Sequence, residues 1–589
     1  MDALTCRNAS RCLTFSCFVL LTACQTSILT THTTVGRSVE SIADEYIIAM
    51  LERYPTLATS YDIKGARHHR LFDNSLDSLA TWQLKEDAWR RELDAAGKPQ
   101  TVGSRDWVTY GFLDEELNAS QAIRICRKEL WETSTTTAWY TEVPFIFDVQ
   151  PLQSDIDKAD ALARLGQVSR YIDTEIENLR QGLALGYSSP RMTVEGVPAQ
   201  VRSLLLRDNP FLNMGRRSND DTFEKAVTGV FDNEVVPALN RFAEFIEREY
   251  LPTARTQISI SYNPNGADCY PALIRSYATL SVTAEEVHRL GLNQVATIRN
   301  EMRTILDLHF GSESVAVFLR RINQSPEFTF RNEQDVLQYS VDSLDAARAK
   351  MSEAFDLLPK ANVLVKPYPA FAASGSGEYH SSSEDGERPG IYYIAVIEPE
   401  QRSQATQQST LYHETYPGHH LQGAIALELG GKVHSIARYL WNSGYSEGWA
   451  LYSERLAEEL DLYNRPLDKM GLLSDQSARA VRLVVDSGIH TKDWSRDKAL
   501  EYMLNNCGWS RIDIENEINR YISWPGQANS YMLGMLEIKR LRTLAEQRLQ
   551  ARFDLKSFHR RFLENGSITL PMVEQVIMTW IEQVEAGNE

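Results

Sequence analysis

Apolar residues at helical spacing constrain the fold of this chain most, because the pattern repeats through most of its 589 residues. Segments 38–54, 160–186, 222–251 and 281–309 place apolar side chains three or four positions apart, with acidic residues early and basic residues late. The last segment opens with the capping-box spacing, a threonine three residues before a glutamate. We therefore predict a mainly α fold built from amphipathic helices.

Residues 360–399 interrupt the helical pattern, since Val, Tyr and Ile runs alternate there with Gly, Ser and Pro. This composition predicts a small β-sheet, and the edge of such a sheet can hold an extended peptide through main-chain hydrogen bonds. Neither an internal repeat nor a long Pro/Gly linker divides residues 39–589. We expect one large helical domain over that range.

The first residues have the character of a secretion signal. Arg7 and Arg11 precede the apolar stretch "CLTFSCFVLLTA", which is too short to span a bilayer comfortably. The stretch closes on "LTAC", which resembles the bacterial lipobox, in which Cys24 would be lipidated. A plain signal peptide cleaved nearby and a short buried helix are the alternatives.

The lipoprotein reading divides the N-terminal region into a signal peptide at 1–23 and a polar tether at 24–38. Gln25 follows the lipobox cysteine where an aspartate would retain the protein at the inner membrane. This points to the outer membrane, facing the periplasm, with the lipid anchor as the only membrane contact.

Charge and cysteine content narrow the possible functions. A net charge of -18 without a basic run argues against a nucleic-acid partner and favours a peptide or another small substrate. Beyond the leader, only Cys126, Cys269 and Cys507 remain, which is neither a disulfide framework nor a CxxC metal site. We predict three buried thiols, although one pair could bridge in an oxidising compartment.

The segment "LYHETYPGHHLQ" at 411–422 begins like the zinc-protease motif H-E-x-x-H, in which two histidines one helical turn apart bind the metal. His413 and Glu414 fill the first two places, but Pro417 stands at the second histidine. In an unbroken helix His420 would return to the face of His413 only about 10.5 Å further along, too far to share an ion. The helix must therefore be distorted. Treating Pro417–Gly418 as an insertion makes His419 the second ligand, with His420 as the alternate.

A third ligand is expected on the helix predicted at 444–460. Glu447 and Glu454 lie seven residues apart and thus on about the same face. Glu447 follows His419 by 28 residues, which suits a helix-loop-helix return, and its neighbours are small or apolar. Those neighbours argue against a solvated surface glutamate.

Four segments, "HETYPGHHLQ", "SEGWALYSE", "VVDSGIH" and "RYISWPGQANSYMLG", together resemble the bacterial domain-of-unknown-function 885 family. That family carries H-E-x-x-P-G-H and E-G-W-A, and is regarded as related to zinc-dependent peptidases of the helical zincin type, such as thimet-type oligopeptidases and angiotensin-converting enzyme. The resemblance runs from about Ser41 to the C-terminus. It implies zinc held by His413, His419 and Glu447, with Glu414 as general base.

Further residues are candidates for the rest of a peptidase site. His490 and Tyr531 could stabilise an oxyanion, although a buried histidine or tyrosine in a structural hydrogen bond is an equal alternative. Arg520 is a candidate clamp for a substrate carboxylate, with a plain salt bridge as the alternative. Tyr379, in the sheet region, could contact substrate through its side chain.

A zinc-dependent peptidase that hydrolyses short peptides in the cell envelope through metal-activated water is the function these residues favour. Schemes with a serine or threonine nucleophile are disfavoured because no G-x-S-x-G elbow accompanies a suitable His and Asp. The alternative is an envelope lipoprotein that binds zinc or peptide without turnover. Glu414 favours catalysis, because a pure binding site needs no base there. A structural scaffold would require the three histidines and two glutamates to be a coincidence.

Overall fold

Helices form where the apolar spacing predicts them. In the computed structural model, which describes residues 37–60, 63, 65–322, 325–368 and 377–588, α1 (Val39–Arg53) starts from an N-cap at Ser38. Helix α15 (Ala284–His309) opens with a reciprocal capping box between Thr283 and Glu286. The predicted mainly α fold is confirmed. The predicted signal peptide, the lipidated cysteine and the tether up to residue 36 lie outside the described residues.

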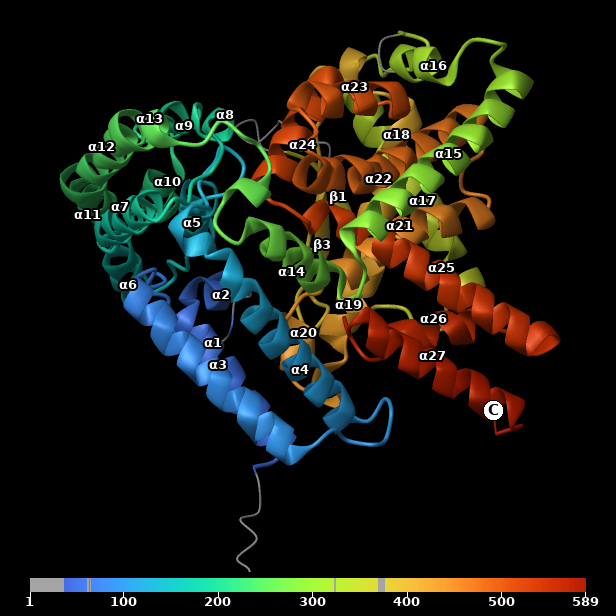
Figure 1. Ribbon diagram of the computed structural model, residues 1–589, viewed down its shortest axis with the longest axis horizontal. Helices are drawn as coiled ribbons and strands as arrows, with labels where there is room; N and C mark the ends of the chain where they lie inside the picture. Colours follow the sequence, from blue (N-terminus) through green and yellow to red (C-terminus); the bar gives the residue numbers. More distant parts are fainter. Residues whose placement is uncertain (1–36, 61–62, 64, 323–324, 369–376, 589) are drawn as a thin grey trace, which may run out of the picture. The chain divides into compact units, whose positions relative to one another are not determined.

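Residues Arg37–Glu589 form one compact unit with two clusters of buried apolar side chains. The smaller cluster draws on residues between Leu71 and Ala254. There α7 and α9 pack against α12, and α10 packs against α5 and α11, in a bundle coloured from light blue to green in Figure 1. The helices up to this point are α2 (Pro55–Ser60), α3 (Leu76–Ala96), α4 (Arg105–Ile123), α5 (Trp139–Val149), α6 (Asp155–Leu165), α7 (Val168–Ala184), α8 (Arg191–Val194), α9 (Val197–Ser203), α10 (Pro210–Arg217), α11 (Asp221–Val230), α12 (Val236–Phe245) and α13 (Leu251–Thr253).

The larger cluster surrounds α22 (Pro466–Lys492), which is buried almost continuously from Leu467 to His490. Helix α15 packs along α22 (Figure 1), and α18 also packs against it. The remaining helices are α14 (Gly266–Ala278), α16 (Val315–Arg321), α17 (Glu333–Ala354), α18 (Gln404–Glu414), α19 (His419–Glu428), α20 (Ile436–Tyr439), α21 (Ser443–Glu459), α23 (Arg496–Asn506), α24 (Arg511–Ser523), α25 (Ser530–Leu549), α26 (Leu555–Leu563) and α27 (Leu570–Glu585).

The predicted sheet has three strands, β1 (Val363–Pro367), β2 (Gly377–His380) and β3 (Gly390–Ile394), in the order β1-β3-β2. Strand β3 pairs in parallel with β1 and antiparallel with β2. Strand β2 is therefore an edge strand of the described sheet, and it contacts α18, which carries the first part of the histidine motif.

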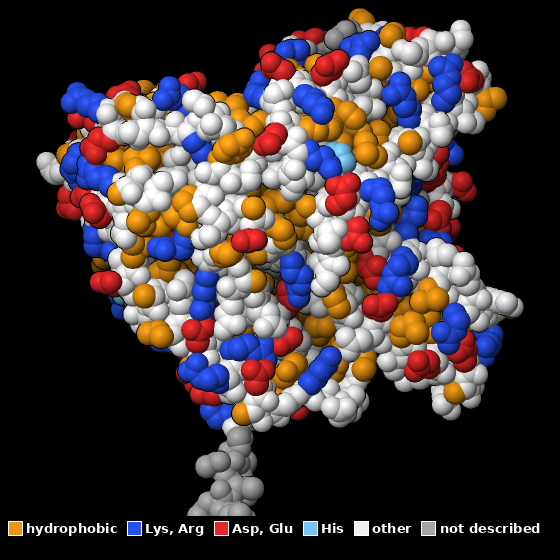
Figure 2. Space-filling view, in the orientation of Figure 1, with side chains coloured by type: hydrophobic (Ala, Val, Ile, Leu, Met, Phe, Trp, Pro, Cys, Tyr) orange, Lys and Arg blue, Asp and Glu red, His pale blue; other side chains and the backbone are white. Residues whose placement is uncertain are grey.

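The cysteine prediction was wrong for two of the three residues. Cys126 and Cys269, 143 residues apart in sequence, form a disulfide that links the chain just after α4 to α14, while Cys507 is free and buried. Two cysteines so far apart give no local signal of their pairing. The described part of the chain contains no helix that is both long and apolar enough to cross a bilayer. Cationic and anionic side chains are interspersed on the face shown in Figure 2.

Candidate metal centre

The Pro-Gly pair divides the histidine motif between two helices. Helix α18 ends at Glu414 and α19 begins at His419. A Cβ atom on Gly418 would lie 1.9 Å from the carbonyl oxygen of His413, so this tight return requires glycine. The Pro417 carbonyl accepts hydrogen bonds from Trp449 Nε1 at 2.9 Å and from the Ser453 hydroxyl at 3.1 Å. Helix α21 thus holds the return in place.

This return brings His413, His419 and Glu447 together, so that one ligand atom from each lies within 4.8 Å of the others. Glu447 Oε2 is 3.4 Å from Nε2 of each histidine. For ligand bonds of about 2.1 Å, the edge of a tetrahedral zinc site is about 3.4 Å. Both distances from Glu447 therefore match the edge of a zinc site, and the third pair of atoms, those of the two histidines, lies within 4.8 Å.

The surroundings of these atoms also fit a cation. Glu447 Oε2 is buried and, despite its two ion-pair contacts, accepts no hydrogen bond of normal geometry from the described residues. Burial opposes charge on His413, but Glu447 and Glu454 outweigh it and raise the pKa of His413 to about 9. Burial likewise opposes charge on Glu447, but the two imidazoles hold its pKa well below the usual range. Positive charge is therefore stabilised where the metal would sit. Zinc binding itself stays a prediction.

Glu454 positions His413. Its Oε1 lies 2.9 Å from His413 Nδ1, and its Oε2 accepts a hydrogen bond of 2.8 Å from Gln476. A proton on Nδ1 donated to Glu454 leaves the Nε2 lone pair directed at the metal position, as outer carboxylates do for metal-binding histidines. The sequence placed Glu454 on the face of Glu447, but we assigned it no role. The seven-residue spacing was the available signal.

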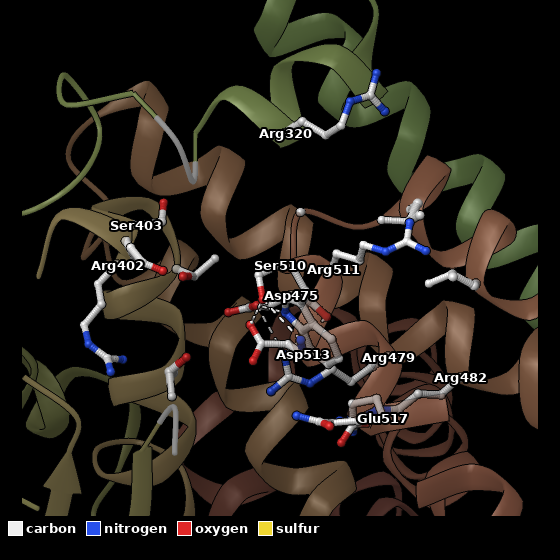
Figure 3. A pocket seen from close by; sticks show the side chains of 18 of the residues that line it. Arg320, Arg402, Ser403, Asp475, Arg479, Arg482, Ser510, Arg511, Asp513 and Glu517 are labelled. Carbon is white, nitrogen blue, oxygen red and sulfur yellow. Dashed lines mark hydrogen bonds and ion pairs between the residues drawn. The ribbon is translucent and has the colours of Figure 1, made fainter. Parts of the chain in front are cut away.

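Glu414 stands between this cluster and a cavity. The cavity has a volume of about 1310 Å³ and is walled by α18, α22, α23 and α24 (Figure 3). Glu414 lines it and accepts a 3.1 Å hydrogen bond from the main-chain N–H of Tyr379 in β2. Burial raises the pKa of Glu414, although His419 and His413 oppose the shift. A carboxylate with a raised pKa suits proton transfer.

His420 turns away from the cluster. It is fully buried, with Nδ1 3.0 Å from the Tyr379 hydroxyl and Nε2 3.1 Å from the carbonyl oxygen of Ala361. Burial lowers its pKa to about 4. The Tyr379 hydroxyl is therefore hydrogen-bonded to His420. Tyr379 contacts the candidate site through its main-chain N–H, which bonds Glu414, rather than through its side chain.

Tyr531 lies beside the cluster. Its ring is 6.3 Å from that of His413 and within 15° of parallel, and its hydroxyl has no hydrogen-bond partner among the described residues. Arg520, by contrast, is committed to Glu517 at 3.0 Å and to Gln527. Tyr531 thus keeps a free donor close to the site, while both Nη atoms of Arg520 already donate to neighbouring side chains.

His490 is not brought to the cluster. Its Nδ1 accepts a 3.1 Å hydrogen bond from the Ile260 main-chain N–H, and its Nε2 lies 3.0 Å from the Tyr521 carbonyl oxygen. Burial lowers its pKa to about 3. Both ring nitrogens are thus bonded to the main chain, and His490 fits the structural alternative rather than the catalytic role that we predicted.

Comparisons with known proteins agree with the resemblance seen in the sequence. The sequence profile of a family described as "bacterial protein of unknown function (DUF885)" matches residues 55–577. No curated protein matches the chain. Among solved structures, a "putative lipoprotein" from Colwellia psychrerythraea is 26% identical with a TM-score of 0.86, over 93% of this chain and 100% of that one. A "putative lipoprotein of unknown function" from Shewanella oneidensis is 18% identical with a TM-score of 0.74, over 92% and 100%.

Proposed function

This chain belongs to the DUF885 family of bacterial proteins of unknown function, and from that premise we propose that it is a zinc-dependent peptidase hydrolysing short peptides. One observation carries the proposal. Ligand atoms of His413, His419 and Glu447 lie within 4.8 Å of one another, next to Glu414 at the wall of a large cavity. A site that only bound zinc would need neither the adjacent base nor the cavity.

Zinc bound there would polarise a peptide carbonyl and lower the pKa of a bound water toward about 7. Glu414 would accept the proton of the attacking water and pass it to the leaving amine, a task that a raised pKa favours. Tyr531, with its free hydroxyl beside His413, would donate a hydrogen bond to the developing oxyanion.

The surroundings of Glu414 suit an extended substrate. The cavity of about 1310 Å³ exceeds the usual range of small-molecule pockets, about 300 to 1,000 Å³. Strand β2 is at the sheet edge, and the N–H of Tyr379 points away from β3 toward Glu414. A peptide aligned along β2 could make main-chain hydrogen bonds there and present one of its bonds to the metal site.

We place this activity in the bacterial envelope. The two similar solved structures are each described as a "putative lipoprotein", and this chain has "LTAC" after an apolar leader. The Cys126–Cys269 disulfide is typical of proteins outside the reducing cytosol. The proposal includes a lipid anchor at Cys24, in the outer membrane and facing the periplasm.

Metal analysis of the purified protein, combined with mass-spectrometric cleavage of a mixed peptide library, tests the function. The parent should hold one zinc ion and cleave peptides, and Glu414→Gln should keep the zinc but lose about 10² to 10⁴-fold in rate, as expected for a lost general base. Equal rates for parent and variant would remove Glu414 from this role. A zinc-loaded parent that cleaves nothing would favour the alternative of a zinc- or peptide-binding lipoprotein.

A further inference from the structure

Helix α22 carries two arginines in its buried stretch, and both line the cavity. Arg479 is 8% exposed and Arg482 is 5% exposed. Figure 3 shows both at one end of the cavity, with Glu517 close to Arg482. Buried guanidinium groups are costly unless carboxylates or other acceptors surround them. The partners of each arginine therefore indicate whether it is structural or awaits a ligand.

The two arginines differ in charge balance. Arg479 lies near two carboxylates, Asp475 at 3.4 Å and Glu454 at 3.9 Å. Arg482 has one carboxylate, Glu517 at 2.9 Å, which it shares with Arg520 at 3.0 Å. Positive charge is thus in excess around Glu517 and not around Arg479.

A further buried carboxylate, four residues after Arg482 in α22, does not correct this excess. Asp486, which interacts electrostatically with Arg520, instead accepts hydrogen bonds from Tyr270, Gly526 and Asn529. Burial also raises the pKa of Asp486 to about 6. In the described part of the chain, the two guanidinium groups beside Glu517 therefore form no ion pair with a second carboxylate.

Arg482 also has an unused donor. Its Nε donates to the Tyr521 hydroxyl at 3.3 Å and its Nη2 to Glu517, but its Nη1 is buried and has no hydrogen-bond partner among the described residues. Buried donors are rarely left unpaired in folded proteins. Since Arg482 lines the cavity, an acceptor that enters the cavity could complete its hydrogen bonding.

Arg482 lies one aromatic ring away from the metal ligands. Its guanidinium carbon is 4.4 Å from the ring centre of Tyr531, and that ring lies 6.3 Å from the ring of His413, nearly parallel to it. A residue of extended peptide spans about 3.3 to 3.6 Å. A group bound at Arg482 would therefore be a few residues from the scissile bond.

We propose that Arg482 binds a carboxylate of the peptide substrate, held in place by Glu517, which Arg520 in turn positions. This inference rests on the proposed peptidase function and names its substrate class: peptides with a carboxylate a few residues from the cleaved bond. The carboxylate belongs either to the free C-terminus or to an acidic side chain. Arg482 thus takes the clamp role that the sequence assigned to Arg520.

Matched peptides test the proposal on the unmodified protein. Each library peptide that is cleaved is made with a C-terminal acid or amide, and, where it contains Glu, with Gln in its place. We expect one of these neutral forms to lower kcat/KM by about 10- to 100-fold, as for the loss of one charge-assisted hydrogen bond. A preference for the C-terminal acid over the amide would identify the C-terminus as the source of the carboxylate. A preference for Glu over Gln would identify an acidic side chain.

A variant ties the preference to the residue. Arg482→Met keeps an apolar stem against Tyr531 and leaves Glu517 paired with Arg520, so the preference should fall to within about two-fold. Arg511 lines the same cavity but is exposed and paired with Glu515, and Arg511→Met should keep the full preference. Equal cleavage of charged and neutral peptides by the parent would overturn the proposal while leaving the peptidase function standing.

Binding measurements separate failure of the proposal from failure of the function. The same peptide pairs are titrated calorimetrically into zinc-loaded Glu414→Gln protein, which requires no turnover. Tighter binding of the carboxylate form, abolished by adding Arg482→Met, would support the proposal even if the parent cleaved nothing. Binding that ignores the carboxylate would overturn it.

Discussion

His419 and His420 are neighbours with the same side chain, but their surroundings differ. His419 begins α19 and directs Nε2 to Glu447 at 3.4 Å, while His420 is enclosed by Tyr379, Tyr416 and the Ala361 carbonyl. The sequence could separate them because proline and glycine predict a break, and a break sets the register of the following residues. The partners of His420 come from distant segments and could not be predicted.

We predict that His419→Ala loses zinc and that His420→Ala retains it. Loss of a ligand should weaken zinc binding by more than the about 10- to 100-fold expected of an outer-shell change. Competition with a chromophoric chelator measures both affinities, and circular dichroism confirms that each variant is folded. Loss of zinc from His420→Ala alone would show that the Pro-Gly insertion sets a different register.

His490 offers a pH test of its structural role. Its pKa in the folded protein is about 3, because burial disfavours the charged ring, against about 6.5 in an unfolded chain. Between these values the unfolded chain binds the additional proton, so the stability from neutral His490 is complete above about pH 6.5 and is lost as the pH falls toward 3.

We therefore predict that the stability difference between the parent and His490→Gln shrinks by about 2 kcal/mol from pH 7 to pH 5. Denaturant unfolding at both values measures it. A pH-independent difference for His490→Gln would mean that His490 is not held neutral by burial.

At the scale of elements, the site depends on how closely α21 and α25 cross. A Cβ atom on Gly534 would lie 2.0 Å from the Gly444 carbonyl oxygen, and one on Gly448 would lie 2.6 Å from the Gly534 main chain. Three glycines thus bring the two backbones into contact. The crossing places Tyr531 of α25 close to Glu447 of α21. Burial, and next the Glu447 carboxylate, raise the pKa of the Tyr531 hydroxyl.

We predict that Gly534→Ala separates these helices, lowering stability by about 1 to 3 kcal/mol and weakening zinc binding through displacement of Glu447. Thermal unfolding and chelator competition give the two readouts. Gly423 in α19 is the matched control, because a Cβ atom there meets nothing within 4 Å and alanine favours a helix. If Gly534→Ala is as stable as Gly423→Ala, the close crossing is not required.

The elements and the grouping of His413, His419 and Glu447 could be predicted because their signals are local: helical spacing, turn residues, the histidine motif at 411–422 and a glutamate among small or apolar neighbours on a later helix. Contacts between distant segments could not. The Glu454–His413 pair and the excess charge at Arg482 depend on helix crossings that a single sequence does not specify. One sequence signal pointed to these buried contacts. The segment "SARAVRLVVDSGIH" of α22 sets arginines among apolar residues, and arginines that are buried in this way require partners.

For the whole molecule, the envelope location leads to a test at the N-terminus. If Cys24 is the lipidated residue, Cys24→Ser should remain unprocessed or leave the membrane fraction, because the anchor would be absent. Cell fractionation with mass spectrometry of the intact protein measures both. Mature, processed Cys24→Ser in the membrane fraction would be incompatible with an anchor at this position.

The Cys126–Cys269 disulfide fits an envelope location, because disulfides persist mainly outside the reducing cytosol. It joins residues 143 positions apart, and each partner is almost completely buried, at 2% and 1% exposure. A crosslink that closes a long loop restricts the unfolded chain, so we predict that Cys126→Ala/Cys269→Ala lowers the free energy of unfolding by about 2 to 5 kcal/mol. Denaturant unfolding with and without reductant measures the effect.

The parent should lose stability in reductant and the double variant should not. Thiol titration of the denatured parent should find Cys507 as a free thiol and the Cys126–Cys269 pair oxidised. If the protein isolated from its host carries both thiols reduced, the bond does not form in the cell, and the argument from oxidation to an envelope location fails with it.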